Sequence, residues 1–431
     1  MFIINDLFSE TSQLKRLENW LLSKPPNQSV TGFGDGVTRR KSYAAGMNLR
    51  IFAGAILFFC ATAIFAADPN MPKNSRTGPF ILGAEVSWAP EDEADGAKYF
   101  DHGVQKDIFQ ILADYKFNYI RLRLFVNPGA TNGYAAGRKE AFCDLAHVIA
   151  LAKRARAHGL GLLLDIHYGD TWTSPGHQDW PGAWRGLKFS ELTNTIHSYT
   201  HNVIAQMKAA GVTPDMVQVG NEISNGVLFP DGSRSHFDNF AAFIQAGIAG
   251  IREVDPKIKI VLHHHLGRSN AVMREWLDNF TRRGTDFDLI GMSCYAQATE
   301  GDWKNNFDDL AKRYPDKGLL VVESSGRKRY LNDLMFNTPD KKGWGTFIWE
   351  PTRHKEALFD HEGKNAGGGA GAVFKSQEIN AVAATTNTAG TVAEPQNHGG
   401  RYDANALLDL YPQMSRDYGN TQLDQTHLSP E

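Results

Sequence analysis

Two glutamates each follow a short apolar run of the kind that forms a buried strand. Glu222 comes after Met216–Asn221, and Glu323 comes after Gly318–Val322. Two carboxyl groups that face each other across a bound sugar can hydrolyse a glycosidic bond, because one protonates the leaving oxygen while the other attacks the anomeric carbon. When the reaction retains the anomeric configuration, the two groups lie about 5 Å apart. Glu222 and Glu323 therefore predict glycoside hydrolysis, provided that the fold brings their carboxyl groups together.

Neighbouring side chains suggest different roles for the two glutamates. Arg121 and Tyr295 end other apolar runs and could keep Glu323 ionised, because a nearby cation and donated hydrogen bonds lower a carboxyl pKa. Glu222 would then be the acid, with a pKa raised by its surroundings. Asn221, immediately before it, could hydrogen-bond a sugar 2-hydroxyl. The alternative is a structural salt bridge from either glutamate to Arg121 or the arginine two positions later, which would also orient a catalytic carboxylate.

Charged and aromatic residues end most of the other apolar runs. Five tryptophans lie at these ends or in the loops that follow: Trp88, Trp172, Trp180, Trp184 and Trp349. The flat face of an indole ring suits the C–H face of a sugar, although core packing would explain part of this set equally well. We predict nine substrate-binding residues: Asn221, Arg121, Asp165, His167, Trp172, His263, Tyr295, Trp349 and Trp88.

Three consecutive histidines at positions 263–265 form a pattern that can bind a metal ion. Side chains alternate along a strand, so His263 and His265 would share a face. The other run ends offer no third ligand at a matching spacing. Packing or substrate contact explains these histidines better, and we expect no metal and no other cofactor.

Eight apolar runs alternate with helical patterns from Phe80 onward. The predicted strands are 80–85, 119–124, 161–167, 216–221, 259–263, 289–294, 318–323 and 345–350. The predicted helices are 104–115, 141–158, 191–210, 240–253, 271–281, 303–314, 329–336 and 404–418. Near-continuous apolar strands are typical of parallel sheets covered on both faces. Eight such units predict a closed (β/α)₈ TIM barrel, an α/β fold with its chemistry at the carboxyl ends of the strands.

An open doubly wound sheet is the alternative to the barrel, but no G-x-G-x-x-G turn follows the first strand. Residues 131–138 and 172–188 are predicted to be long loops at the carboxyl face. Residues 363–401 include a Gly-rich stretch and predict a loop insertion between strand 8 and helix 8 of a single domain.

The N-terminal segment differs in character from the rest of the chain. Residues 51–65 are apolar and uncharged, which fits the hydrophobic region of a secretory signal and is shorter than the about 20 residues of a membrane span. A buried helix or an uncleaved anchor is the alternative. We expect a chain secreted to the extracellular space or the periplasm. The predicted parts are a non-native upstream extension at 1–46, a signal peptide at 47–67 and the glycosidase domain at 68–431.

The composition excludes several classes of protein. Lys and Arg total 45 against 48 Asp and Glu, a net charge of −3, so the chain lacks the basic excess of a nucleic-acid binder. Without residues 1–67 the totals become 38 and 44, and the net charge becomes −6. Three cysteines are too few for a disulfide scaffold. We expect Cys143 and Cys294 to be buried free thiols.

Several segments resemble glycoside hydrolase family 53, the arabinogalactan endo-β-1,4-galactanases. They are GAEVSW at 83–88, IRLRL at 120–124, LDIHY at 164–168, DTW at 170–172 with Pro175-Gly176, TPDMVQVGNE at 213–222 and WEP at 349–351. The resemblance runs in order from about Gly83 to Asp360 and resumes at 410–412. It implies a (β/α)₈ barrel and a retaining mechanism, with Glu222 as acid/base and Glu323 as nucleophile.

The sequence departs from the family pattern in the loops. Ser324-Ser325-Gly326-Arg327 follows Glu323 where the family usually has Thr, aromatics and Pro. After strand 6 the chain has Cys294-Tyr295-Ala296-Gln297 in place of Tyr-Tyr-Pro and a Trp. These differences concern the number of sugar subsites and the preferred chain length. Some bacterial relatives bind calcium near loops 7 and 8, but those ligands do not transfer residue by residue, because these loops diverge.

The leading hypothesis is a secreted, monomeric endo-β-1,4-galactanase acting on the galactan side chains of pectin. Its partner would be the polysaccharide alone, without nucleic acid and without stable membrane association. Another retaining β-glycanase, acting on mannan, glucan or xylan, is the first alternative. A non-catalytic carbohydrate-binding barrel is the second, and the presence of both glutamates argues against it.

Overall fold

The computed structural model describes residues 71–295, 301–353, 357–362 and 399–420. The predicted upstream extension, the predicted signal peptide and nearly all of the predicted insertion at 363–401 lie outside the described residues. Among the helices in the described ranges, none is both long and apolar enough to cross a membrane.

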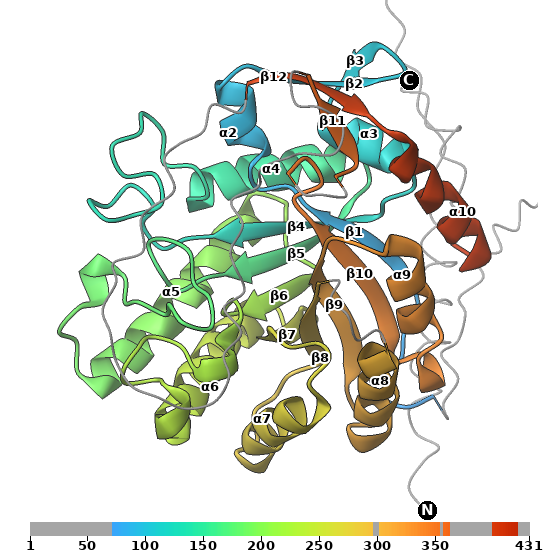
Figure 1. Ribbon diagram of the computed structural model, residues 1–431. Coiled ribbons are helices and arrows are strands. Elements are labelled where there is room, and N and C mark those ends of the chain that lie inside the picture. The colour runs from blue at the N-terminus through green and yellow to red at the C-terminus, as the bar shows by residue number, and fades with distance from the viewer. Residues whose placement is uncertain (1–70, 296–300, 354–356, 363–398, 421–431) are drawn as a thin grey trace, which may run out of the picture. The chain divides into compact units, whose positions relative to one another are not determined.

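Eight parallel strands close into a barrel with helices around it, which confirms the predicted fold (Figure 1). Around the barrel the hydrogen-bonded order is β1-β10-β9-β8-β7-β6-β5-β4, and β4 pairs with β1. The strands are β1 (Ile81–Glu85), β4 (Tyr119–Leu124), β5 (Gly161–Ile166), β6 (Met216–Val219), β7 (Lys259–His264), β8 (Leu289–Cys294), β9 (Gly318–Ser324) and β10 (Gly343–Trp349).

Helices follow the barrel strands largely where the apolar periodicity predicts them. They are α3 (Ile108–Asp114), α4 (Leu145–Ala157), α5 (Phe189–Ala209), α6 (Phe237–Val254), α7 (Asn270–Arg282), α8 (Gly301–Arg313), α9 (Lys328–Phe336) and α10 (Leu410–Asp417). The prediction of one helix over 104–115 is wrong at its start. Asp107 has extended backbone and its carboxylate accepts from the Phe109 N–H at 2.8 Å, so it caps a helix that begins at Ile108.

A second, four-stranded sheet was not predicted. Its hydrogen-bonded order is β11 (Phe359–His361), β12 (Gly400–Ala404), β2 (Ala97–Asp101) and β3 (Val104–Lys106). The short helix α2 (Ala89–Ala94) precedes β2. The last helix is consequently shorter than predicted, because Ala404 belongs to β12 and a 3₁₀ turn at Ala406–Asp409 precedes α10.

Apolar side chains fill the barrel below its mouth and the space between the strands and helices. The interior cluster consists of Ile81, Leu163, Met216, Val261, Leu289, Leu320, Val322 and Phe347. Gly83 makes room for the Phe347 ring, because a Cβ at that position would come within 2.4 Å of it. Cys143 and Cys294 are buried and free, as predicted. The polar side chains of the predicted site lie above this apolar floor, toward the carboxyl ends of the strands.

Candidate active site

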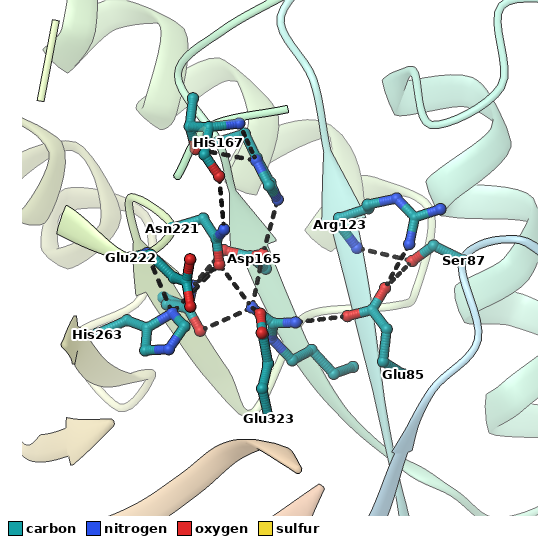
Figure 2. Close-up of polar contacts among 12 residues, drawn as sticks. Glu85, Ser87, Arg123, Asp165, His167, Asn221, Glu222, His263 and Glu323 are labelled. Carbon is teal, nitrogen blue, oxygen red and sulfur yellow. Dashed lines mark hydrogen bonds and ion pairs between the residues drawn. The ribbon is translucent and has the colours of Figure 1, made fainter. Parts of the chain in front are cut away.

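The two glutamates lie at the carboxyl ends of β6 and β9. Glu323 is within β9, whereas Glu222 lies just beyond β6 with left-handed backbone at φ 47° and ψ 47°. Such a conformation is unfavourable for a residue with a side chain and is often found at functional sites. Gly220, at φ 88°, supplies part of the turn. Figure 2 shows the carboxyl groups of Glu222 and Glu323 directed toward a common space beside Asn221.

Glu323 is held by a cation and a phenol. Its Oε1 lies 3.0 Å from a terminal nitrogen of Arg121, and its Oε2 accepts from the Tyr295 hydroxyl at 2.9 Å. Burial raises the pKa of Glu323, and the Asp165 and Glu85 charges act in the same direction. The Arg121 charge and the Tyr295 hydrogen bond oppose that rise, so they favour the ionised carboxylate.

Arg121 also organises the carboxylates behind Glu323. Its guanidinium lies 2.8 Å from Glu85 and 2.8 Å from Asp165, and it donates to Asn221 Oδ1 at 3.0 Å. Burial opposes ionisation of Asp165, but the charges of Arg121 and His167 outweigh it and hold the pKa of Asp165 below its ordinary value. One buried cation thus joins three carboxylates from three strands.

Glu222 has different partners. Its Oε1 accepts from the Ser293 hydroxyl at 2.9 Å, and its backbone N–H donates to His263 Nδ1 at 3.2 Å. Burial raises the pKa of Glu222 to about 8, and the nearby charge of Glu323 contributes to the rise. Burial, together with the charge of Arg121, holds the pKa of His263 well below its ordinary value, so this imidazole is neutral.

Three tryptophans form an aromatic wall beside the carboxyl pair. Trp88 lies 5.1 Å from Trp349 and 5.7 Å from Trp172, measured between ring centroids. The Arg123 guanidinium lies 4.4 Å from the Trp172 ring and forms an ion pair with Glu350 at 2.6 Å. All three indoles are partly exposed. A site with an aromatic wall and a pair of carboxyl groups, one buried and one partly exposed, suits the hydrolysis of a sugar polymer.

Comparison with known proteins agrees with this geometry. The sequence profile of glycosyl hydrolase family 53 matches residues 81–328, more than half of the chain. The chain belongs to glycosyl hydrolase family 53. It is therefore a glycoside hydrolase with the (β/α)₈ barrel of that family.

Individual family 53 proteins resemble the chain over most of their own length. It is 34% identical to a probable arabinogalactan endo-β-1,4-galactanase A of Aspergillus terreus, covering 64% of this chain and 86% of the relative. It is 33% identical to an arabinogalactan endo-β-1,4-galactanase of Thermothelomyces thermophilus, covering 56% and 73%. The solved family 53 catalytic domain of Ignisphaera aggregans is 32% identical with a TM-score of 0.60, covering 64% of this chain and 87% of that domain.

The family 53 site brings together all eleven residues predicted for catalysis or substrate binding, but in two layers. Arg121, Asp165, His167 and His263 each expose 1% or less of their surface, so they contact other protein groups. His167, for example, lies 3.0 Å from Asp165 and accepts from the Thr173 N–H. The other seven are more accessible: Glu222, Tyr295, Trp88, Trp172 and Trp349 are partly exposed, while Asn221 and Glu323 expose 6% and 7% of their surface.

Trp180, Trp184, His264 and His265 lie outside this site. Trp180 packs against the core cluster between strands and helices. Trp184 is buried and packs against Tyr199 at 5.5 Å. His264 packs against Trp276 at 5.2 Å, while His265 Nδ1 contacts the Ser224 hydroxyl at 2.6 Å. Within the described ranges, no three His, Cys, Asp or Glu residues are arranged to hold a metal ion.

Sequence reasoning did not place Ser293 in the family 53 site. Met292 and Cys294 pack in the core cluster between strands and helices, so alternation along β8 turns Ser293 toward the barrel axis. That alternation was the signal available in the sequence. The pairing of β8 with β9 shifts register between Met292 and Ser293, which brings Ser293 opposite Glu323.

Proposed function

We propose that this family 53 chain is an endo-acting β-1,4-galactanase that hydrolyses galactan or arabinogalactan with retention of configuration. Glu222 is the acid/base and Glu323 is the nucleophile. The observation that carries the proposal is the pair of carboxyl groups at the ends of β6 and β9, one beside Arg121 and the other beside Ser293. The named relatives, which are arabinogalactan endo-β-1,4-galactanases, support the choice of substrate.

In the first step, a Glu323 oxygen attacks the anomeric carbon while Glu222 gives its proton to the leaving glycosidic oxygen. The bond to the leaving sugar breaks, and a covalent glycosyl-enzyme forms on Glu323. A pKa of about 8 keeps Glu222 protonated at neutral pH, as this step requires. Arg121 favours the ionised nucleophile at the same pH.

In the second step, Glu222 is a carboxylate and takes a proton from water. The water oxygen attacks the anomeric carbon, the bond to Glu323 breaks, and Glu222 is protonated again. Formation of the ester removes the negative charge of Glu323, which lowers the pKa of Glu222 and suits its new role as a base.

The partly exposed side chains suggest how a sugar is held. Trp88, Trp172 and Trp349 offer ring faces, and Asn221 lies between the two carboxyl groups, where it can bind a sugar 2-hydroxyl. Two hydrogen bonds fix the Asn221 side chain. Arg121 donates to Asn221 Oδ1, and the Asn221 amide nitrogen donates to the Thr173 carbonyl at 2.9 Å.

Digestion of purified galactan, mannan, β-glucan and xylan, followed by chromatography of the products, tests the proposal. We expect release of short oligosaccharides from galactan alone. Faster release from another polysaccharide would favour a different β-glycanase, and binding to galactan without any product would favour a carbohydrate-binding barrel. Export and removal of the N-terminal segment are also proposed, with a monomeric mature chain that needs no cofactor. N-terminal sequencing of the exported protein tests the cleavage.

A further inference from the structure

Ser293 and His263 form a chain of hydrogen bonds behind the acid/base carboxyl. His263 Nε2 lies 2.9 Å from the Ser293 Oγ, and the Ser293 hydroxyl donates to Glu222 Oε1 at 2.9 Å. Both side chains are buried, since His263 exposes none of its surface and Ser293 exposes 4%. A substrate in the mouth therefore finds almost no surface of either residue to contact.

The backbone of Glu222 indicates the direction of this chain of hydrogen bonds. Two groups lie 3.2 Å from His263 Nδ1: the Glu222 N–H, which can only donate, and Asn221 Oδ1, which already accepts from Arg121 and Gln218. We therefore take Nδ1 as the acceptor of the backbone N–H. A neutral imidazole then carries its proton on Nε2 and donates it to the Ser293 Oγ. Among the described residues, the Ser293 proton then has Glu222 Oε1 as its acceptor.

We propose that Ser293 is a positioning residue for Glu222, with its hydroxyl oriented by His263 so that Oε1 is occupied and Oε2 carries the transferred proton. The inference rests on the proposed function, because it assumes that Glu222 is the acid/base. In the first step the proton passes from Oε2 to the glycosidic oxygen, and in the second step a proton returns from water to the same oxygen. The hydroxyl also stabilises the carboxylate that must exist between the two transfers.

Several other charged or titratable groups face Glu222, so the effect of Ser293 must be separated from theirs. These groups are Glu323 on β9, Arg121 on β4, Asp165 on β5, His263 on β7 and Tyr295 after β8. A substitution at Ser293 changes none of these charges. Its effect on the pH profile therefore reports the hydroxyl alone.

The test is the pH profile of kcat/KM for galactan in Ser293→Ala. Removing a donor to the carboxylate raises the pKa of Glu222, so the basic limb moves to higher pH by about one unit. Ser293→Cys keeps the size of the side chain with a much weaker donor and should shift the limb similarly. Ser415→Ala is the matched control, because Ser415 is equally buried on α10 with its hydroxyl 3.4 Å from the Asn420 carbonyl.

A basic limb that stays in place in Ser293→Ala and Ser293→Cys, while the proteins remain folded, would overturn the inference. His263→Leu tests the second half. Because it also removes the acceptor of the Glu222 N–H, the expected result is a larger shift of the limb in the native background than in the Ser293→Ala background. If His263→Leu shifted the basic limb as much in Ser293→Ala as in the native protein, His263 would not act through Ser293. Full activity of Glu222→Gln would instead refute the proposed function, so the two failures are distinguishable.

Discussion

The two carboxyl groups proposed to act in catalysis have surroundings that differ in charge, although both groups lie in the same mouth. Glu323 lies beside the Arg121 cation and a phenol, whereas Glu222 lies beside a hydroxyl and a neutral imidazole. Burial raises the pKa of both groups, so burial cannot separate their roles. The Arg121 guanidinium is paired directly with Glu323 at 3.0 Å, so we expect it to favour ionisation of Glu323 over that of Glu222.

The largest expected effect comes from removing the Glu323 carboxylate, the negative charge that pairs with Arg121. Glu323→Gln should reduce activity on galactan by at least the 10²–10⁴-fold typical of losing a general acid, because no nucleophile remains. Measurement of reducing sugar released at the pH optimum checks this. A variant that kept full activity would falsify the mechanism. The thermal unfolding temperature of Glu323→Gln should stay close to that of the native protein. A loss of activity would then come from the missing nucleophile and not from unfolding.

Removal of Glu222, the proposed proton donor, should reduce activity less than removal of Glu323. The size of the loss should depend on the leaving group of the substrate. Glu222→Gln should lose about 10²–10⁴-fold in rate on galactan. An aryl glycoside whose nitrophenol leaves without a proton should still react in the first step. The second step would then limit, so we expect a burst of nitrophenol equivalent to the enzyme. Equal losses on both substrates, with no burst, would argue against Glu222 as the acid/base.

Arg121→Met would remove the difference between the two surroundings. Three buried carboxylates would lose their shared cation, which should destabilise the protein by about 3–5 kcal/mol. In any protein that folds, the pKa of Glu323 rises, so the acidic limb of kcat/KM moves to higher pH. Thermal unfolding and the pH profile measure the two effects.

Arg154→Met provides the control for the arginine substitution. Arg154 also bridges two carboxylates, those of Glu93 and Asp107, but these ion pairs are partly exposed. Its loss should cost about 1 kcal/mol or less and leave both limbs in place. If the two arginine variants behaved alike, the buried cation would have no special role.

Tyr295→Phe should have the smallest effect. It removes one hydrogen bond to the Glu323 carboxylate, so the pKa of Glu323 rises and the acidic limb shifts upward by less than in Arg121→Met. Tyr168→Phe removes a buried hydroxyl that contacts Thr200 at 2.8 Å away from the carboxyl pair, and should leave the limb unchanged. A downward shift in Tyr295→Phe would contradict the assignment.

The barrel could be predicted from the sequence because parallel strands covered on both faces are almost entirely apolar. The second sheet could not, because its strands are short and mixed in polarity. Val104 shows the difficulty: it fits the apolar side of a helix, yet it lies at the edge of the sheet with 59% of its surface exposed. Asp107 was the better signal, since its side chain suits a helix start.

Most members of the candidate site were predictable, Ser293 excepted, but the division of the site into buried and accessible residues was not. Strand ends identified Glu222, Glu323 and Arg121, because charged residues after apolar runs are conspicuous. The sequence could not show that Arg121 would be buried among carboxylates instead of facing the substrate. The left-handed backbone of Glu222 was equally inaccessible, since only the neighbouring Gly220 suggests an unusual turn.

The second sheet has a consequence for how the chain folds during synthesis. Strand β12 pairs with β2 about 300 residues earlier, and on α10 Tyr411 stacks on Phe117 at 4.0 Å. The Asn420 side chain also hydrogen-bonds both backbone groups of Phe80, next to the first barrel strand. None of these contacts can form until the end of the domain has left the ribosome. Completion of the fold is therefore a late event, governed by contacts between the two ends of the domain.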